Sequence, residues 1–449
     1  MDFPYDSKYA EHLSKMVQFP TVSTTNDENT DWKPLQDFQN YLRETYPLVH
    51  SRMSVTKIGN GSLLFHLKSE HPTHRPVLIM SHQDVVPAGD ASRWTYPPFS
   101  GKIADGKIWG RGSIDCKALV MAEMETVEAL LKEGFAPNYD LYIALGHNEE
   151  VEAAPDVKGS KLTVAFLKEH GVKLGCLFDE GGKVLCGKDN GYSEDLAQVS
   201  LGEKASVNFV IYKDGKGGHA MKPGKGTLLG SIGRAIAAIE ANPMPYRLIP
   251  ITEAQLKASA GLQPEKIQEI YADPQHHWDE LCRLARDDIF LDGLLHTTFA
   301  VTMASGSSIS NVLPTHAECT VNVRILQGDT IDSVTEYLKS ILPADVKIKC
   351  MGTENPRPVG SAESREFKLL EDVLSEIYDG HIKVVPSLLL GGTDSRNYTE
   401  ICDNVFKFGG GYNTAEYGQT HQIDEHIPVS ALGASIQFLT AYLKAYQNL

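Results

Sequence analysis

The sequence predicts an α/β protein in which a mainly parallel sheet is interrupted by a smaller α+β domain. Short apolar runs alternate with helical stretches in the first third of the chain, as in βαβ units. The middle has the strand and helix order of a ferredoxin-like domain, and the first pattern returns near the end. With 449 residues, the chain has room for two or three domains of about 150 residues.

The first third contains apolar runs that suit strands buried on both faces. Residues 117–133 repeat apolar side chains near the 3.6-residue period of a helix, and Gly134 suits its C-cap. A shorter helix is expected at 164–170. The expected strands are residues 76–81, 141–145 and 174–178.

The middle of the chain has the order strand, helix, strand, strand, helix, strand. A polar, largely helical insertion at 252–295 separates its first helix from its second strand. The expected strands are 205–212, 298–303, 318–326 and 346–351, and the expected helices are 227–240 and 330–342.

The last part of the chain returns to the first pattern, with a strand at 405–408 and a closing helix at 430–446. We therefore expect residues 1–194 and 353–449 to form one domain together, and residues 195–352 to form the domain inserted into it.

Charge and hydropathy exclude several classes of protein. The chain has 42 Lys and Arg against 58 Asp and Glu, a formal net charge of −16. Such an acidic chain is a poor partner for nucleic acid or for an anionic membrane surface. No segment approaches the roughly 18 to 20 apolar residues of a membrane span, and the polar, acidic start lacks the pattern of a secretory signal.

The seven cysteines are dispersed and contain no CxxC pair. This usage is typical of reduced thiols in the cytoplasm, and it excludes the common zinc sites made of cysteines. Any metal ion is therefore expected to be bound by His, Asp and Glu.

Ionisable residues follow each of the three early strands. If these strands are parallel, the residues meet at one edge of the sheet, where open α/β sheets bind ligands. Each cluster alone has an ordinary explanation, such as a hydrogen-bonded histidine, a solvated pair of glutamates or a helix N-cap. Three clusters of imidazole and carboxylate at one edge favour a site for zinc, manganese or cobalt. The clusters are Ser81 to Asp84, Gly146 to Glu150 and Asp179 to Gly182.

A glycine-rich loop at 106–117 opens the long helix. Its spacing matches neither GxxxxGK[ST] nor GxGxxG, so we exclude a phosphate-binding loop. A tight loop that brings the carboxylate of Asp115 to the sheet edge is the better interpretation.

In aggregate, these motifs resemble the two-zinc metallohydrolase family that includes aminoacylase, carboxypeptidase S and bacterial glutamate carboxypeptidase. The segments Asp179 to Gly182 and Gly391 to Arg396 are most similar to the carboxypeptidase S and aminoacylase branch. Asn148 departs from the acidic residue common at its position, without removing a ligand. The matching stretches are 81–87, Trp94, 98–99, 105–117, 147–151, 179–182, 217–220, 391–396 and 421–425.

The resemblance implies two zinc ions, with manganese or cobalt as substitutes, in a zinc-peptidase-like catalytic domain with an inserted dimerisation (lid) domain. Glu149 would be the general base, and Asp84 would orient His82. The implied ligands are His82 and Asp179 for one metal ion, Glu150 and His421 for the other, and Asp115 as the bridge.

Further roles are implied for the inserted domain and its surroundings. His219, which alone suggests a surface turn, would stabilise the oxyanion in the partner subunit's site. Asn311 and Arg324 would bind substrate, although Arg324 also fits the surface of a strand. Gly391, Gly392 and Thr393 would form a wall of the substrate site. Cys116 would be a packed, inert thiol after a cis peptide bond.

The predicted function is therefore a zinc-dependent hydrolase that cleaves a peptide or N-acyl amide bond next to a free carboxylate. Its substrate would be a small peptide or an N-acyl amino acid, and the enzyme would be a cytoplasmic homodimer. The first alternative is a dipeptidase, or an amidase for another carboxylated metabolite. The alternative from another class is a catalytically silent binding scaffold.

Overall fold

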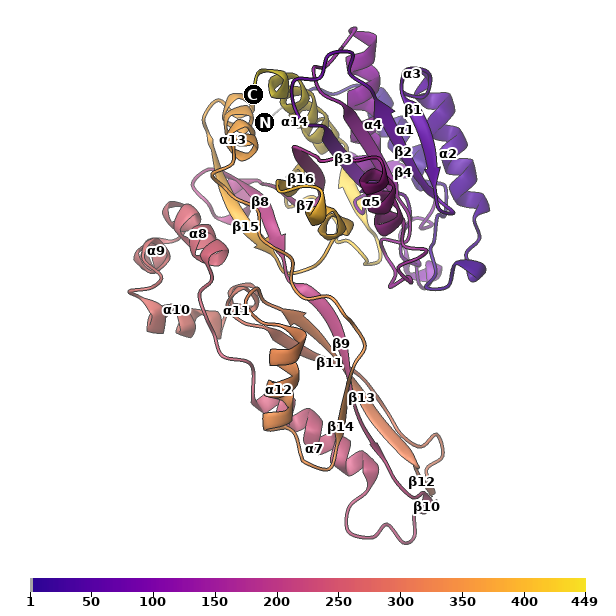
Figure 1. The fold of residues 1–449 in the computed structure, drawn as a ribbon, viewed down its shortest axis with the longest axis vertical. Helices are drawn as coiled ribbons and strands as arrows, with labels where there is room; N and C mark the ends of the chain where they lie inside the picture. The colour runs from indigo at the N-terminus through magenta and orange to yellow at the C-terminus, as the bar shows by residue number, and fades with distance from the viewer. Residues whose placement is uncertain (1–2) are drawn as a thin grey trace. The chain divides into compact units, whose positions relative to one another are not determined.

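The computed structural model describes residues 3–449, which divide into two compact units (Figure 1). Unit 1 contains the described residues up to Leu201, Gly360–Ser387 and Thr393–Leu449. Unit 2 contains Gly202–Val359 and Leu388–Gly392. The division into a catalytic domain and an inserted lid domain, with boundaries after 194 and 352, stays a prediction.

The main sheet has eight strands in the order β1-β2-β6-β3-β7-β16-β8-β15. Its four central strands, β6, β3, β7 and β16, are parallel, which confirms the predicted α/β fold. β3 and β6 are buried at every residue, as their continuous apolar runs predicted. The strands are β1 Ser54–Ile58, β2 Ser62–Leu67, β3 Val77–His82, β6 Leu141–Gly146, β7 Cys176–Leu185, β8 Asp195–Glu203, β15 Ile382–Leu389 and β16 Val405–Asn413.

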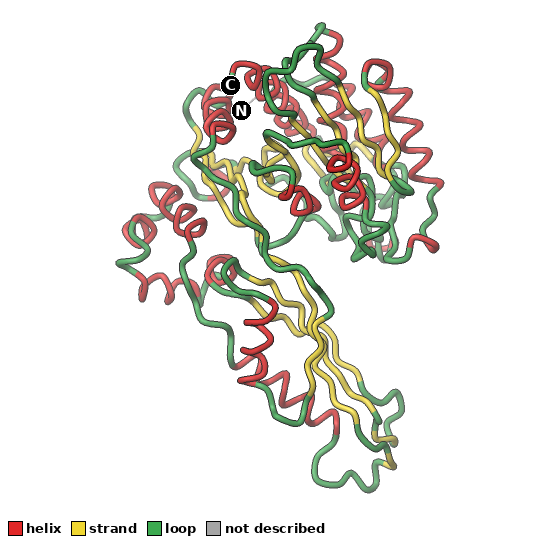
Figure 2. The backbone as a smooth tube through the Cα atoms, viewed as in Figure 1, coloured by secondary structure: helices red, strands yellow, loops and turns green. Residues whose placement is uncertain are grey.

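Helices cover both faces of this sheet (Figure 2). α4 and α14 pack together on one face, and α5 packs on the other, where Val164 and Leu167 join a core with Leu78 and Met80 of β3. The helices of unit 1 are α1 Ser7–Val17, α2 Lys33–Thr45, α3 Pro47–Arg52, α4 Lys117–Lys132, α5 Gly159–Glu169, α6 Gly187–Asn190, α13 Arg365–Ile377 and α14 Leu432–Ala445, with the 3-10 turns η1 Asp27–Asn29, η2 Ala91–Arg93, η4 Asp394–Glu400, η5 Val429–Ala431 and η6 Tyr446–Asn448.

A small antiparallel sheet joins two segments of unit 1 that are distant in sequence. Its order is β17-β5-β4, so the glycine-rich loop that follows β5 lies beside the chain near His426. The strands are β4 Lys102–Ala104, β5 Lys107–Trp109 and β17 His426–Pro428.

Unit 2 is built on an antiparallel sheet of order β11-β13-β9-β14. Together with α7 and α12, it has the ferredoxin-like order that the sequence predicted. In β13, buried residues alternate with partly exposed ones, because one face covers the core of this unit. The elements are β9 Ala205–Asp214, α7 Leu228–Ala241, β11 Thr298–Ser305, β13 His316–Ile325, α12 Ile331–Ile341 and β14 Lys347–Cys350, with the short pair β10 Gly218–His219 and β12 Val312–Leu313.

The polar insertion folds as four helices with a small core of their own around Leu256, Leu281 and Leu295. They are α8 Pro250–Ser259, α9 Glu265–Ala272, α10 Trp278–Ala285 and α11 Ile289–Leu295, with the 3-10 turn η3 Ala260–Leu262. Among the residues that the structure describes, no helix is both long enough and apolar enough to cross a membrane.

Candidate metal centre

The three predicted clusters meet at one edge of the main sheet. His82 is the last residue of β3, and Glu149 and Glu150 follow the end of β6. Asp179 and Glu180 lie within β7. Because β6, β3 and β7 are neighbouring parallel strands, their carboxyl ends bring these side chains to the same place.

The carboxylate of Asp115 lies between two histidines from opposite ends of the chain. Its Oδ1 atom is 3.0 Å from Nε2 of His82, and its Oδ2 atom is 3.2 Å from Nε2 of His421. The same nitrogen of His421 lies 3.1 and 3.0 Å from the two carboxylate oxygens of Glu150. Asp115 thus contacts both histidines, one with each of its two carboxylate oxygens.

These spacings are close to those of a metal centre. Zinc bonds of about 2.0 to 2.2 Å at tetrahedral angles separate the ligand atoms by about 3.3 to 3.6 Å, slightly more than the 3.0 to 3.2 Å between these nitrogen and oxygen atoms. The donor atoms of His82, Asp115 and Glu150 lie within 4.8 Å of one another. The ligand types, imidazole and carboxylate, are those that zinc, manganese and cobalt accept.

The pKa shifts within the cluster also favour a metal centre. Hydrogen bonds with Asp115 and Glu150 raise the pKa of His421 to about 10. Burial and the nearby Asp115 carboxylate raise the pKa of Glu180 to about 8, and burial with the nearby Glu180 raises the pKa of Glu149 well above its ordinary value. Crowded carboxylates repel one another, and bound dications would balance their charge.

Glu180, and not Asp179, is the β7 residue that the structure brings to the cluster. Oε1 of Glu180 is 3.5 Å from Nε2 of His82. The carboxylate of Asp179 instead accepts hydrogen bonds from the main-chain N–H groups of Ser395, at 3.0 Å, and of Glu180, at 2.8 Å. The geometry therefore favours Glu180 as the ligand and gives Asp179 a supporting role.

An irregularity in β7 explains why the pattern of the sequence did not identify Glu180. Against β16, Asp179 is paired with Lys407 but the next pair is Gly182 with Phe408. This break in register lies at Glu180 and Gly181, where it re-aims the side chains. Residues before the break are buried without alternation, so nothing in the sequence indicated which carboxylate faces the site.

The two candidates can be separated by metal affinity. We expect Glu180→Gln to raise the dissociation constant of one metal ion by more than about 100-fold, because it removes a direct ligand. Asp179→Asn keeps an acceptor for Ser395 and is expected to raise it by about tenfold, as loss of an outer partner does. Titration of metal-free protein with zinc measures both; a larger effect of Asp179→Asn would contradict the assignment.

Asp84 supports the centre differently from the predicted arrangement. Nδ1 of His82 lies 2.9 Å from the main-chain carbonyl oxygen of Asp84, while the carboxylate of Asp84 is 3.7 Å away. That carboxylate instead accepts the N–H groups of Glu149 and Glu150, both at 3.2 Å, and the hydroxyl of Ser23 at 2.6 Å. The backbone of Asp84 orients the histidine, and its side chain holds the turn that follows β6.

The glycine-rich loop is fixed by Glu425, which sequence reasoning left without a role. The Glu425 carboxylate is fully buried, forms an ion pair of 2.5 Å with Arg111, and accepts the N–H groups of Ile114 and Asp115. The bond between Asp115 and Cys116 is cis, as the resemblance implied. Cys116 is buried, and its sulfur contacts the backbone of His82.

The residues predicted to bind substrate lie mainly in unit 2. His219 is exposed on β10, which pairs with β12, and its Nδ1 accepts the N–H of Met221 at 3.2 Å. Arg324 lies on β13, where its Nε donates to Asn322 at 3.1 Å. Asn311, in the loop before β12, accepts the N–H of Ala220 at its carbonyl oxygen. Their roles stay predictions.

The segment 391–393 joins the two units in sequence. Gly391 and Gly392 belong to unit 2, whereas Thr393 belongs to unit 1 and is buried. The hydroxyl of Thr393 lies 2.6 Å from that of Ser395, beside Asp179. Thr393 therefore has a local structural contact in addition to the predicted place in a substrate wall.

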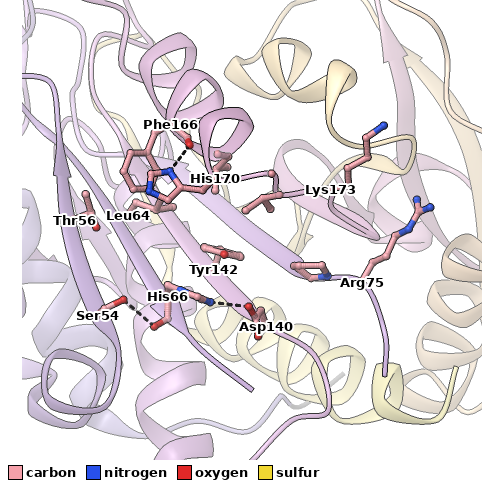
Figure 3. A pocket seen from close by; sticks show the side chains of 14 residues that line it. Ser54, Thr56, Leu64, His66, Arg75, Asp140, Tyr142, Phe166, His170 and Lys173 are labelled. Carbon is pink, nitrogen blue, oxygen red and sulfur yellow. Dashed lines mark hydrogen bonds and ion pairs between the residues drawn. The ribbon is translucent and has the colours of Figure 1, made fainter. Parts of the chain in front are cut away.

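A separate cavity of about 630 Å³ lies at the other end of the parallel strands (Figure 3). Its lining includes Pro76, just before β3, and Asp140, just before β6. His66 stacks on Tyr142 with ring centres 4.3 Å apart and binds Asp140 at 2.9 Å. Because this cavity faces the amino ends of β3 and β6, it is not part of the metal centre.

The fold and the clustered imidazoles and carboxylates define the class of protein as a metal-dependent hydrolase. Residues 78–445 match the sequence pattern of peptidase family M20/M25/M40, so the chain belongs to this family. The resemblance predicted from the motifs is thereby confirmed. The chain is therefore a metallopeptidase or amidohydrolase.

Curated relatives are similar over nearly the whole chain. The N-fatty-acyl-amino acid synthase/hydrolase PM20D1 of Bos taurus is 30% identical over 97% of this chain and 87% of its own length. Carboxypeptidase S of Saccharomyces cerevisiae is 27% identical over 96% of this chain and 83% of its own length.

Solved structures share the fold. The M20 family metallo-carboxypeptidase Sso-CP2 from Sulfolobus solfataricus has a TM-score of 0.71 at 19% identity, covering 98% of this chain and 100% of its own. The YXEP protein of Bacillus subtilis, described as a dinuclear metal binding peptidase, has a TM-score of 0.59 at 12% identity, covering 98% of this chain and 99% of its own.

Proposed function

We propose that this protein is a two-zinc hydrolase that releases an amino acid by cleaving a peptide or N-acyl amide bond next to its free carboxylate. The observation that carries the proposal is the position of Asp115, with one oxygen toward His82 and the other toward His421. Two of the relatives, an N-fatty-acyl-amino acid synthase/hydrolase and a carboxypeptidase, support this class of substrate.

The proposed ligands form two groups that share Asp115. His82 and Glu180 would complete one site, and His421 and Glu150 the other. When bound, the two dications would polarise the scissile carbonyl and make water a better nucleophile. Three ligand carboxylates against two dications leave about one net positive charge at the centre. Manganese or cobalt would suit the same ligands.

Glu149 is the proposed general base. Its carboxylate would accept a proton from the attacking water and pass it to the nitrogen of the leaving amine. The carboxylate of Asp84 accepts the main-chain N–H of Glu149, which holds the backbone that carries this side chain. Since Glu149 immediately precedes the proposed ligand Glu150, the base lies beside the centre without being needed to hold it.

Substrate recognition is proposed for unit 2 and the segment after it. Arg324 would bind the free carboxylate with its planar guanidinium, and Asn311 would assist it. His219 would stabilise the oxyanion in a homodimer. Gly391, Gly392 and Thr393 would line the substrate site. All seven cysteines are free, in keeping with the proposed cytoplasmic location.

A panel of matched substrates tests the proposal. We expect zinc-loaded protein to hydrolyse N-acyl amino acids or dipeptides, and analogues with the carboxylate converted to an amide to react about 100-fold more slowly. Comparing kcat/KM across acyl groups and dipeptides separates the amino-acylase and carboxypeptidase activities from a dipeptidase. Equal rates for the amidated analogues would contradict carboxylate recognition, and protein that neither binds metal nor hydrolyses the panel would favour the scaffold alternative.

A further inference from the structure

The turn at residues 148–151 carries both the proposed base, Glu149, and the proposed ligand, Glu150. It begins two residues after the end of β6, with Asn148 in the left-handed conformation, at φ of 60°. The carboxylate of Asp84 accepts the N–H groups of Glu149 and Glu150. One side of the turn, the N–H side, is therefore held by a buried anion.

The carbonyl side of the same turn is held by a buried cation, Lys158. Its ammonium group donates to the carbonyl oxygens of Asn148 at 2.7 Å, Glu149 at 3.1 Å and Val151 at 3.5 Å. The side chain is only 7% exposed, although it belongs to a long, charged residue that ordinarily reaches solvent. Lys158 immediately precedes α5, so the packing of this helix fixes its position.

The charge of Lys158 is balanced by Asp394, whose side chain is 3% exposed. Oδ1 of Asp394 lies 3.2 Å from the ammonium nitrogen. Within the described residues neither Asp394 oxygen accepts a hydrogen bond, so this ion pair compensates its buried charge. The next residue, Ser395, donates its N–H to Asp179, which adjoins Glu180. The ion pair of Lys158 and Asp394 thus connects the turn to the hydrogen bond between Ser395 and Asp179 of β7.

We propose that Lys158, with Asp394 as its counter-ion, is a positioning residue that holds the 148–151 turn in the conformation required for catalysis and for metal binding. This inference rests on the proposed function. An anion on the N–H side and a cation on the carbonyl side fix the peptide groups of the turn through charge-assisted hydrogen bonds. The ammonium group donates to the three carbonyls and pairs with the carboxylate, so removing it leaves the carbonyls of Asn148 and Glu149 without this donor.

The direct test is Lys158→Met, which keeps an unbranched side chain and removes the donors. We expect kcat to fall at least tenfold with KM changed less than threefold, since the turn contributes the base. We expect the zinc dissociation constant to rise at least tenfold, because Glu150 is displaced. In metal-free protein, amide hydrogen exchange in a peptide spanning 147–158 should become at least tenfold faster, a readout that needs no catalysis.

The matched control is Lys168→Met. Lys168, at the other end of α5, pairs with Glu400, the last residue of η4, at 2.5 Å on the surface. It joins the same two elements as Lys158 and Asp394 without contacting the turn. We expect its kcat, zinc affinity and hydrogen exchange to stay within twofold of the wild type. Effects as large as those of Lys158→Met would overturn the proposal.

The double variant Lys158→Met/Asp394→Asn separates positioning from simple charge balance. Lys158→Met alone leaves Asp394 as an unpaired buried charge and should lower Tm; the second substitution removes that charge and should restore much of the loss. Hydrogen exchange in the 147–158 peptide should stay fast, and kcat and zinc affinity should stay low, because the carbonyls of the turn still lack the ammonium donor. If they recover with Tm, Lys158 is only a counter-ion and the proposal is wrong.

These measurements distinguish failure of this inference from failure of the proposed function on which it rests. If the wild type binds no zinc and hydrolyses no substrate of the panel, the proposed function fails. The other outcome is that the wild type binds zinc and hydrolyses substrate, and Lys158→Met matches it in hydrogen exchange, zinc affinity and kcat. In that case the proposed function stands and the proposed role of Lys158 fails.

Discussion

We expect replacement of Glu149, the proposed general base, by glutamine to lower kcat by about 10²- to 10⁴-fold while the proposed metal ions stay bound. Glutamine has nearly the same shape but cannot accept the proton from water or return it to the leaving amine, and general acid–base catalysis contributes about this factor. Metal content should persist because the groups in contact with His82 and His421 are Asp115, Glu150 and Glu180. Turnover on a substrate of the panel and metal analysis of the same sample measure the two effects.

Glu152→Gln is the matched control for this variant. Glu152 is an exposed glutamate three residues further along the same loop, so its neutralisation changes the charge equally and should leave kcat within about twofold. A Glu149→Gln enzyme with near-normal turnover would end the assignment of the base. Loss of metal in that variant would instead place Glu149 among the ligands.

We expect removal of the proposed metal ions to abolish activity and to lower thermal stability together. We expect a chelator followed by desalting to reduce kcat/KM at least about 10³-fold, since metal ions supply several kcal/mol of transition-state stabilisation. A ligand present at 100 times its dissociation constant stabilises the folded state by about 2.7 kcal/mol, so Tm should fall as the metal leaves. Activity assays and thermal melting, before and after metal removal, check both.

Restoration provides the control for metal removal. Added zinc should return both activity and Tm, and manganese or cobalt should return activity to a degree that depends on the ion. Magnesium, which prefers octahedral oxygen ligands, should restore little. Full activity in protein shown to contain less than a tenth of a metal ion per chain would rule out a metal-dependent mechanism.

The sequence predicted the centre of the fold well because the central strands are buried on both faces. β3 and β6 are continuous apolar runs, and such runs indicate buried strands without knowledge of their neighbours. The edge strand β1 was missed because most of it is exposed, and β8 was missed because its place beside β7 and β16 depends on distant segments. The pattern of residues along one strand does not show which distant strands lie beside it.

The candidate site, like the fold, could be predicted from the sequence only in part. His82 and Glu150 stand in clusters at the ends of predicted strands and Asp115 stands in a tight loop, whereas His421 and the assignment of all four as ligands came from the resemblance. The atoms through which Asp84 acts, and the choice of Glu180 over Asp179, depend on backbone direction at a turn and at a break in register. Lys158 was missed because a lysine eight residues after a glutamate has no local signal; its partner lies more than 230 residues away.

The arrangement of the centre also determines when it can form during protein synthesis. His82, Asp115, Glu150 and Glu180 leave the ribosome early, whereas His421 and Glu425 follow only after the whole of unit 2. At a translation rate of about 5 to 20 residues per second, roughly 10 to 50 seconds separate Glu180 from His421. A nascent chain can therefore offer only the proposed site of His82, Asp115 and Glu180 at first, and the proposed second site, which needs His421, forms only when synthesis is nearly finished.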